Sequence, residues 1–137
     1  MTAIPEADFK LRVRENFAKQ RVMRLIDARL ALVEPGVIEI ELPYREDLTQ
    51  QDGFIHAGII TTILDSACGY AAYTLMPAGS SVLSVEFKVN LLAPAKADVI
   101  KARAEVKRAG KTLTVCTADA FAADKVCATM LATMIRR

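Results

Sequence analysis

The sequence contains no tryptophan, a single histidine, His56, and only three cysteines among its 137 residues. Cys68, Cys116 and Cys127 are odd in number and show no CxxC spacing, which argues against a disulfide framework and against a zinc site. One histidine without a surrounding cluster of carboxylates or thiols does not make a metal centre. We therefore expect buried thiols in a reduced compartment, no metal and no cofactor.

The chain also lacks a strongly basic stretch, since its formal net charge is only +2. A nucleic-acid interface is usually built on clustered Lys and Arg side chains, so nucleic acid is not the expected partner. The first residues, MTAIPEADFKLRVREN, mix acidic and basic side chains where a secretory peptide has an apolar run. The default expectation is a cytoplasmic protein.

The longest apolar run, residues 57–76, carries one charged side chain, Asp65. As a helix this run is about 30 Å long, close to the thickness of a bilayer core. Asp65 near its centre, and the lack of Lys or Arg in its immediate flanks, argue against a membrane span. We expect a helix surrounded by protein, and no membrane partner.

The hydrophobic periodicity predicts one α+β domain over residues 1–137. Phe9, Val13 and Phe17 recur every four residues within an N-terminal helix that is assigned to residues 1–20, with its periodic part over residues 6–20. The remaining segments, in chain order, are a β-hairpin over residues 22–42 around Pro35-Gly36, a polar loop over 43–54, a central helix over 56–76, and extended runs over 83–91, 100–107, 113–122 and 125–135. An antiparallel sheet with one buried face can hold a single long apolar helix across it.

Asp65 poses the main question, because a lone carboxylate in an apolar helix is costly to bury. On a period of 3.6 residues, the helix face around Asp65 is small and partly polar: Gly58, Thr61, Thr62, Gly69 and Ala72. Such a face leaves room for a close approach rather than filling a core. Two interpretations stay open here: a functional carboxylate, or a buried carboxylate that is bonded to Thr61 or to a basic side chain of a neighbouring strand.

The start of the central helix offers a second chemical feature. His56, Ala57 and Gly58 lie where unpaired N–H groups and the helix dipole favour negative charge, so an oxyanion can be held there. A single histidine beside a helix is more often a capping residue than a catalyst. We assign His56 to positioning the loop or polarising a carbonyl, not to general-base work.

The segment from Gln50 to Pro94, with HAGIITTILDSACGYAA followed by LSVEFKVNLLAPA, resembles the PaaI-like acyl-CoA thioesterases of the hotdog-fold superfamily. Their hallmark is HGG with a carboxylate nine residues after the histidine, as His56 and Asp65 are spaced here, and the similarity extends more weakly from about residue 22 to the C-terminus.

The resemblance implies a hotdog fold, in which a curved antiparallel sheet wraps a long central helix. It implies active sites at the interface of a homodimer, with acyl-CoA as the substrate. A homotetramer made of two such dimers is the favoured assembly, although the choice between dimer and tetramer stays open at this point.

The same resemblance assigns roles to individual residues. Asp65 would activate water or attack the thioester carbonyl, and the Ala57 N–H would stabilise the oxyanion. Gln50 would orient the water or the substrate, and Ser84 would come from the partner protomer. His56 completes the set of candidate catalytic residues.

The candidate substrate-binding residues are Gly58, which leaves room at the helix start, and Lys107, Arg108 and Lys111, which could meet the phosphates of coenzyme A.

Two departures from the family pattern bear on these roles. Ala57 replaces the middle glycine of HGG, so the oxyanion geometry must be reachable with a Cβ present. Strict alternation along residues 83–91 also places Ser84 on the face opposite Phe87, away from the helix.

Three other functions remain open from the sequence. The first is an acyl-CoA-binding or sensing module that does not turn its ligand over, against which the costly Asp65 argues. The second is a dehydratase of 3-hydroxyacyl thioesters, whose usual spacing of histidine and carboxylate is absent. The third is a segment that serves only to build an oligomer.

Overall fold

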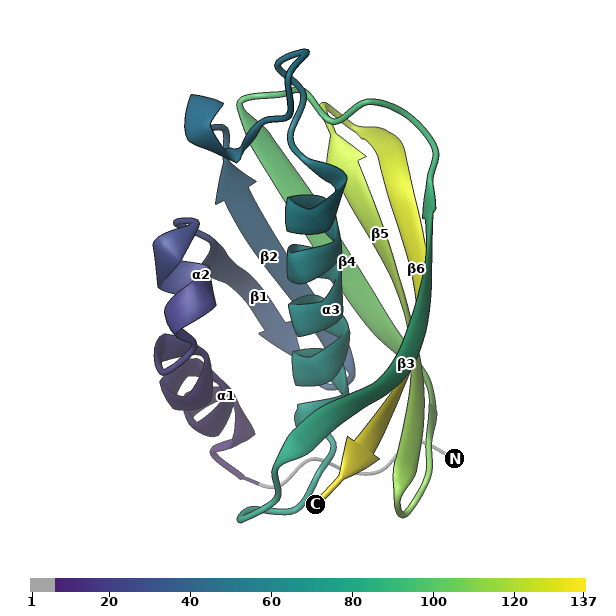
Figure 1. Ribbon diagram of the computed structural model, residues 1–137. Helices are drawn as coiled ribbons and strands as arrows, with labels where there is room; N and C mark the ends of the chain where they lie inside the picture. The colour runs from purple at the N-terminus through teal and green to yellow at the C-terminus, as the bar shows by residue number, and fades with distance from the viewer. Residues whose placement is uncertain (1–6) are drawn as a thin grey trace.

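The computed structural model describes residues 7–137, which form a six-stranded antiparallel sheet curved around one long helix (Figure 1). The elements in chain order are α1 (Phe9–Ala18), α2 (Arg21–Leu25), β1 (Arg29–Glu34), β2 (Val37–Pro43), the 3₁₀ helix η1 (Glu46–Leu48), α3 (Ala57–Tyr73), β3 (Val82–Leu91), β4 (Val99–Ala109), β5 (Leu113–Ala122) and β6 (Lys125–Arg136). This architecture confirms the α+β prediction and the long central helix, which ends at Tyr73 rather than at Met76.

Two sequence predictions are corrected at the N-terminal side. The expected helix over residues 1–20 begins, within the described part of the chain, at Phe9, and its first six residues lie outside that part. The predicted hairpin starts at Arg29 rather than at Val22, because residues 21–25 form α2. A five-residue helix is too short to leave a periodic signal.

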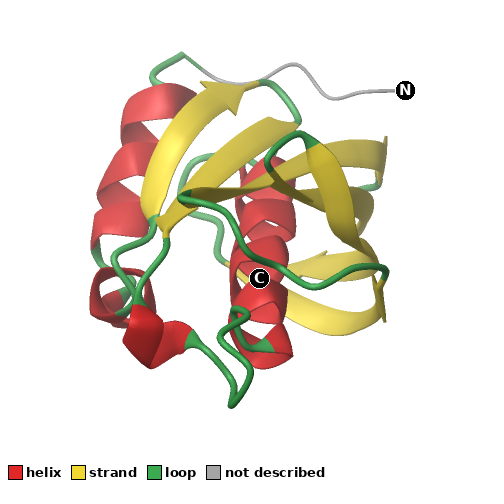
Figure 2. Cartoon of the chain, turned by 90° about the horizontal axis from the view of Figure 1, so that it is seen from above, coloured by secondary structure: helices red, strands yellow, loops and turns green. Residues whose placement is uncertain are grey.

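The strands lie in the order β1-β2-β4-β5-β6-β3, so that β1 and β3 form the two edges. Helix α3 packs on the concave face, while α1 and α2 lie beside it (Figures 1 and 2). The face of the sheet that meets α3 consists largely of small side chains, with Ala102, Ala104, Ala118, Ala120, Ala128 and Ala132 all buried. Small residues let the helix and the sheet approach closely, as dense core packing requires.

A β-bulge in β3 decides where Ser84 points. The register between β3 and β6 shifts between Ser84 and Glu86, so one extra residue is inserted in β3. Ser84 pairs with Met134 and Phe87 pairs with Ala132, and both of these β6 residues are fully buried beneath α3. Directly paired residues lie on the same face, so Ser84 and Phe87 both face the helix. The strict alternation expected from the sequence is therefore wrong at this strand.

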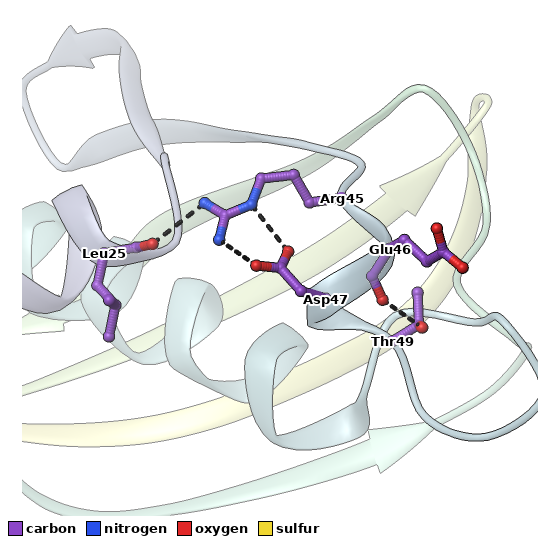
Figure 3. Close-up of polar contacts among 5 residues, drawn as sticks. All are labelled: Leu25, Arg45, Glu46, Asp47 and Thr49. Carbon is purple, nitrogen blue, oxygen red and sulfur yellow. Dashed lines mark hydrogen bonds and ion pairs between the residues drawn. The ribbon is translucent and has the colours of Figure 1, made fainter.

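Arg45 forms a bidentate ion pair within the loop that leads into α3, and a further hydrogen bond from its guanidinium connects this loop to the short helix α2 (Figure 3). Arg45 donates to both carboxylate oxygens of Asp47, each at 2.9 Å, and to the Leu25 carbonyl oxygen at 3.1 Å. The Arg45 guanidinium holds the pKa of the Asp47 carboxyl below its usual range. The pair is exposed and adds little stability, but it fixes the direction of the loop.

The three cysteines are buried and unpaired, as predicted. Burial raises the pKa of Cys68 and raises that of Cys116 to about 12, so both groups remain thiols in the folded protein. Among the described residues, no helix combines the length and the apolar character needed to cross a bilayer.

These thiols predict a loss of stability at high pH. In the unfolded chain they ionise near their ordinary pKa of 9.0, whereas in the folded protein they stay protonated to about 12 in the case of Cys116. Their contribution to stability is complete below pH 9 and is lost as the pH rises toward 12, roughly 1–2 kcal/mol for Cys116 near pH 10.5. Urea unfolding at pH 8 and pH 10.5 measures this loss, and Cys116→Ala should show a smaller difference between the two conditions. An equal difference in the variant would contradict the assignment.

Candidate functional site

The N-terminus of α3 is capped by its own histidine. His56 is the N-cap residue, and its Nδ1 accepts a hydrogen bond of 2.8 Å from the Gly58 N–H. A Cβ on residue 58 would stand only 3.1 Å from that nitrogen, so glycine leaves the space that this cap needs. The structure shows that His56 caps α3, and its predicted role in positioning the loop or polarising a carbonyl stays a prediction. It also shows that the Gly58 N–H is already bonded, which removes this donor from direct substrate contact.

The Ala57 N–H is the donor that this arrangement leaves open. In the described part of the chain no hydrogen bond uses it, whereas the N–H groups of Gly58, Ile59 and Ile60 all bond to His56. Ala57 is absent from the residues with positive φ, so its N–H is presented by regular helical geometry. The alanine that replaces the family's glycine is therefore compatible with an oxyanion site.

Gln50 lies beside this donor in a loop that its own side chain holds in place. Its Oε1 accepts from the N–H groups of Asp52, at 2.6 Å, and Phe54, at 3.3 Å. Because the oxygen is occupied by the loop, the Nε2 amide is the part of the side chain left for a ligand. Gln50 and Ala57 line a largely apolar hollow of about 480 Å³, together with Phe54, Ile55, Ile60, residues 91–95, Cys127 and Ala128. We call it the Ala57 hollow.

Asp65 lies two turns further along α3 and is half-buried. Its Oδ1 accepts a hydrogen bond of 2.6 Å from the Ser84 hydroxyl of β3. The hydroxyls of Thr61 and Thr62 bond to carbonyl oxygens of their own helix, so the predicted alternative of a Thr61–Asp65 bond is wrong. None of the ion pairs among residues 7–137 includes Asp65. The carboxylate is oriented by one hydroxyl but is not neutralised by a cation.

The position of Ser84 corrects a second expectation. The sequence resemblance implied that this serine would come from a partner protomer, but here it contacts Asp65 of the same chain. The bulge in β3 is the physical reason, because it turns Ser84 toward the helix. Sequence periodicity alone gives no sign of an inserted residue.

A second hollow, of about 210 Å³, opens at Asp65, and we call it the Asp65 cavity. It is enclosed by α1, α3 and the start of β3, and it is mainly polar. Its lining consists of Asn16, Gln20, Asp65, Ser66, Gly69, Tyr70, Tyr73, residues 81–84 and Met134. Asn16 and Gln20 were not among the residues singled out from the sequence, because nothing in the spacing of a surface helix shows which polar side chains face a cavity.

The three predicted basic residues do not lie near the start of α3, where the His56 cap and the Ala57 hollow are. Lys107, Arg108 and Lys111 belong to the β4–β5 hairpin, at the end of the sheet away from Ala57 (Figure 1). The Gly36 carbonyl oxygen accepts from the Val106 N–H and the Gly36 N–H donates to Thr74 Oγ1, each at 2.8 Å, which puts this end of β4 beside the C-terminal end of α3. A different cation, Lys96, follows the hollow-lining Ala95 in the chain, and its Nζ is 3.9 Å from where a Cβ on Gly53 would stand.

Comparison with known proteins identifies the family. The model of the thioesterase superfamily matches residues 52–129, which include the start of α3 and Asp65. The chain belongs to this superfamily. A thioesterase family protein from Silicibacter pomeroyi, known from its crystal structure, is 49% identical, with a TM-score of 0.92 over 93% of this chain and 97% of that one.

Two further relatives agree with this membership of the thioesterase superfamily. A protein of Saccharolobus solfataricus, whose name classes it as a candidate esterase, is 32% identical over 75% of this chain and 74% of its own. The PaaI protein of the Escherichia coli phenylacetic acid degradation operon superposes with a TM-score of 0.88 over 95% of this chain and 94% of that one. At 15% identity this last match shows the fold alone, and it confirms the hotdog architecture of this thioesterase-superfamily member.

Proposed function

We propose that the protein hydrolyses acyl-CoA thioesters to a free acid and coenzyme A, with Asp65 as general base and the Ala57 N–H as oxyanion donor. The observation that carries this proposal is the state of Asp65. It is a half-buried carboxylate at a cavity, held through one oxygen by Ser84 and without a cationic partner among residues 7–137. Such a group keeps its second oxygen available to accept a proton.

The reaction then needs no component beyond water and the thioester. Asp65 takes a proton from a water molecule whose oxygen adds to the thioester carbonyl carbon. The carbonyl oxygen becomes an oxyanion that accepts a hydrogen bond from the Ala57 N–H, with the Gln50 amide as a second donor. Collapse of this intermediate breaks the C–S bond, and the departing coenzyme A thiolate takes up the proton held by Asp65.

One chain does not bring these groups together. Ala57 and Asp65 are eight residues apart on α3, which corresponds to about 12 Å along the axis. A base and an oxyanion donor must both lie within about 3 Å of the reacting atoms. The two hollows, moreover, have no lining residue in common. We infer that each active site combines the Ala57 hollow of one copy with the Asp65 cavity of another.

The edge strand β3 supports this inference. It is ten residues long and exposes Leu83, Val85, Phe87 and Leu91, and no strand of the described part of the chain pairs with its outer side. An open apolar edge of this length is normally covered. Ser84 lies at the Asp65 cavity and Leu91 lines the Ala57 hollow, and both face the helix side of the sheet. Antiparallel pairing that sets Ser84 opposite Leu91 of a second copy, with the extra residue of the bulge left unpaired, therefore centres on Lys88. A two-fold symmetric homodimer of this kind contains two composite sites.

The cations Lys107, Arg108 and Lys111 remain proposed contacts for coenzyme A phosphates, now from a neighbouring copy. Lys96 is a candidate from the same chain as Ala57, because it follows Ala95, which lines that hollow. Pairing of two such dimers into a tetramer is also part of the proposal.

The proposal is tested with a panel of acyl-CoAs of different chain length and of aromatic acyl groups, following release of free thiol. We expect turnover of at least one member, with equal amounts of acid and coenzyme A formed. Oxygen esters of the same acids serve as the comparison, since an esterase without thioester preference would favour neither class. Tight binding of an acyl-CoA without thiol release would overturn the proposal in favour of a sensing module.

A further inference from the structure

We propose that the Asp65 cavity selects a short acyl group that carries a hydrogen-bond-accepting oxygen at its far end, and that Gln20, assisted by Asn16, donates to that oxygen. The inference rests on the proposed thioesterase function and assigns a substrate class to it. Five observations lead to it: the volume of the cavity, the hydrogen bonds of its amide side chains, its charge, the lack of a capping role for Gln20, and the glycine at residue 69.

The volume limits the size of the acyl group. At roughly 30 Å³ for each water-sized group, a cavity of about 210 Å³ holds about seven non-hydrogen atoms. A long fatty acyl chain does not fit into this space. The cavity is also mainly polar, whereas a pocket for a plain alkyl chain would be lined by apolar side chains.

The polar side chains of the cavity are arranged to leave donors free. The Ser66 hydroxyl donates to Gln20 Oε1 at 3.1 Å, and the Tyr70 hydroxyl donates to Asn16 Oδ1 at 2.9 Å. Burial raises the pKa of Tyr70 to about 12, so its hydroxyl keeps its proton and remains a donor. Each amide thus has its oxygen occupied, and no hydrogen bond among the described residues uses its nitrogen. A ligand that meets these amide nitrogens must offer an acceptor.

The charge of the cavity limits which kind of acceptor oxygen the ligand can carry. Asp65 lines the cavity, and none of its other lining residues is a lysine or an arginine. An acyl group with its own carboxylate would therefore meet repulsion without compensation. A neutral oxygen, of either a hydroxyl or a ketone, can accept from the two amide nitrogens and is not repelled by the charge of Asp65.

Glutamine at position 20 stabilises helix α2 less than a capping residue would. It is the N-cap residue of α2, where Ser, Thr, Asp or Asn would bond to the helix N–H groups, yet its side chain makes no capping bond. The side chain instead crosses to Ser66 of α3, which is buried. The Gln20 side chain does not stabilise α2 by capping it, but it supplies an amide group to the Asp65 cavity.

Gly69 gives independent support, because packing does not require a glycine there. It lies within α3, where glycine costs about 0.5–1 kcal/mol relative to alanine. A Cβ on this residue would meet nothing within 4 Å. The space beside it belongs to the cavity, so glycine keeps room for a ligand at the expense of helix stability.

The experiment compares acyl-CoAs in matched pairs: straight chains of four to six carbons, each with and without a hydroxyl oxygen on the last carbon or a keto oxygen on the penultimate carbon. We expect kcat/KM to be at least about tenfold higher for the oxygen-bearing member of the preferred pair. In Gln20→Met this ratio should fall to about one, whereas Lys19→Met, an exposed neighbour outside the cavity, should keep it. Circular dichroism verifies that each variant is folded.

Three results would overturn the inference, and they are distinguishable. If the wild type hydrolyses both members of every pair equally, or if Gln20→Met keeps the wild-type ratio, the thioesterase function stands and the selectivity is wrong. If no acyl-CoA of any kind is hydrolysed, both proposals fail. Gly69→Ala provides a second variant: it should raise the melting temperature and lower kcat/KM most for the largest acyl group, and a gain in stability without any change in acyl preference would count against a ligand in this cavity.

Discussion

Asp65→Asn is expected to lower kcat for acyl-CoA hydrolysis by about 10²–10⁴-fold, which is the usual contribution of a general base. The amide has nearly the same shape as the carboxylate, and its oxygen can still accept the hydrogen bond from Ser84. No ion pair is lost, because Asp65 has none among the described residues. The variant should therefore fold and dimerise like the wild type while losing turnover.

A matched control separates this effect from a general loss of negative charge. Asp119 is half-buried like Asp65 but lies on the opposite face of the sheet, between the inward-facing Ala118 and Ala120 of β5. Asp119→Asn should leave kcat/KM within a few-fold of the wild type. Steady-state kinetics on the best substrate, with melting temperatures for both variants, make the comparison. Wild-type activity in Asp65→Asn would remove this residue from the mechanism.

The sequence predicted the fold well where the periodicity was long and regular. The apolar run of α3 and the extended run of β5 cover ten residues or more, and the alternation of β4 covers residues 100–107; the structure confirms all three, with a register shift only at the end of β4. Helix α2, with five residues, and the bulge in β3 gave no such signal. An inserted residue reverses the facing of only part of a strand, so it becomes visible only when the neighbouring strand fixes the register.

The candidate site was predictable to the extent that it depends on one helix. The capping position of His56, the open Ala57 N–H and the small face around Asp65 all follow from positions along α3. The contacts that complete the site come from distant segments: Ser84 from β3 and Gln20 from the start of α2. Their proximity to α3 is a property of the tertiary fold, and no local pattern in the sequence records it.

The composite site also explains why an apolar edge strand is compatible with function. Long open edges are a hazard for aggregation unless something covers them. If two β3 strands pair across a two-fold axis, the same contact that protects the edge joins the two halves of the active site. Dimer formation and activity should then be lost together when β3 is disrupted.

Ala57→Pro is expected to reduce kcat by about 10²–10³-fold, the typical effect of losing one oxyanion donor. Proline lacks the N–H, yet residue 57 is the first residue of α3, a position that proline favours. His56 has φ −57° and ψ 137°, which suits a residue that precedes proline. The substitution therefore removes the donor without breaking the helix, and an unchanged kcat in a folded variant would exclude this N–H from the reaction.

Mixing the two inactive variants tests whether the site is shared between chains. A heterodimer of Ala57→Pro and Asp65→Asn chains contains one site with both defects and one site with neither, since each chain supplies the group that the other lacks. Random exchange of subunits gives one half heterodimers, so about a quarter of wild-type activity should return. A chain carrying both substitutions, mixed with the Ala57→Pro chain, is the control and should show no recovery. If the two single variants exchange subunits, as mass spectrometry can establish, and activity stays absent, then the two halves of the site do not come from different copies.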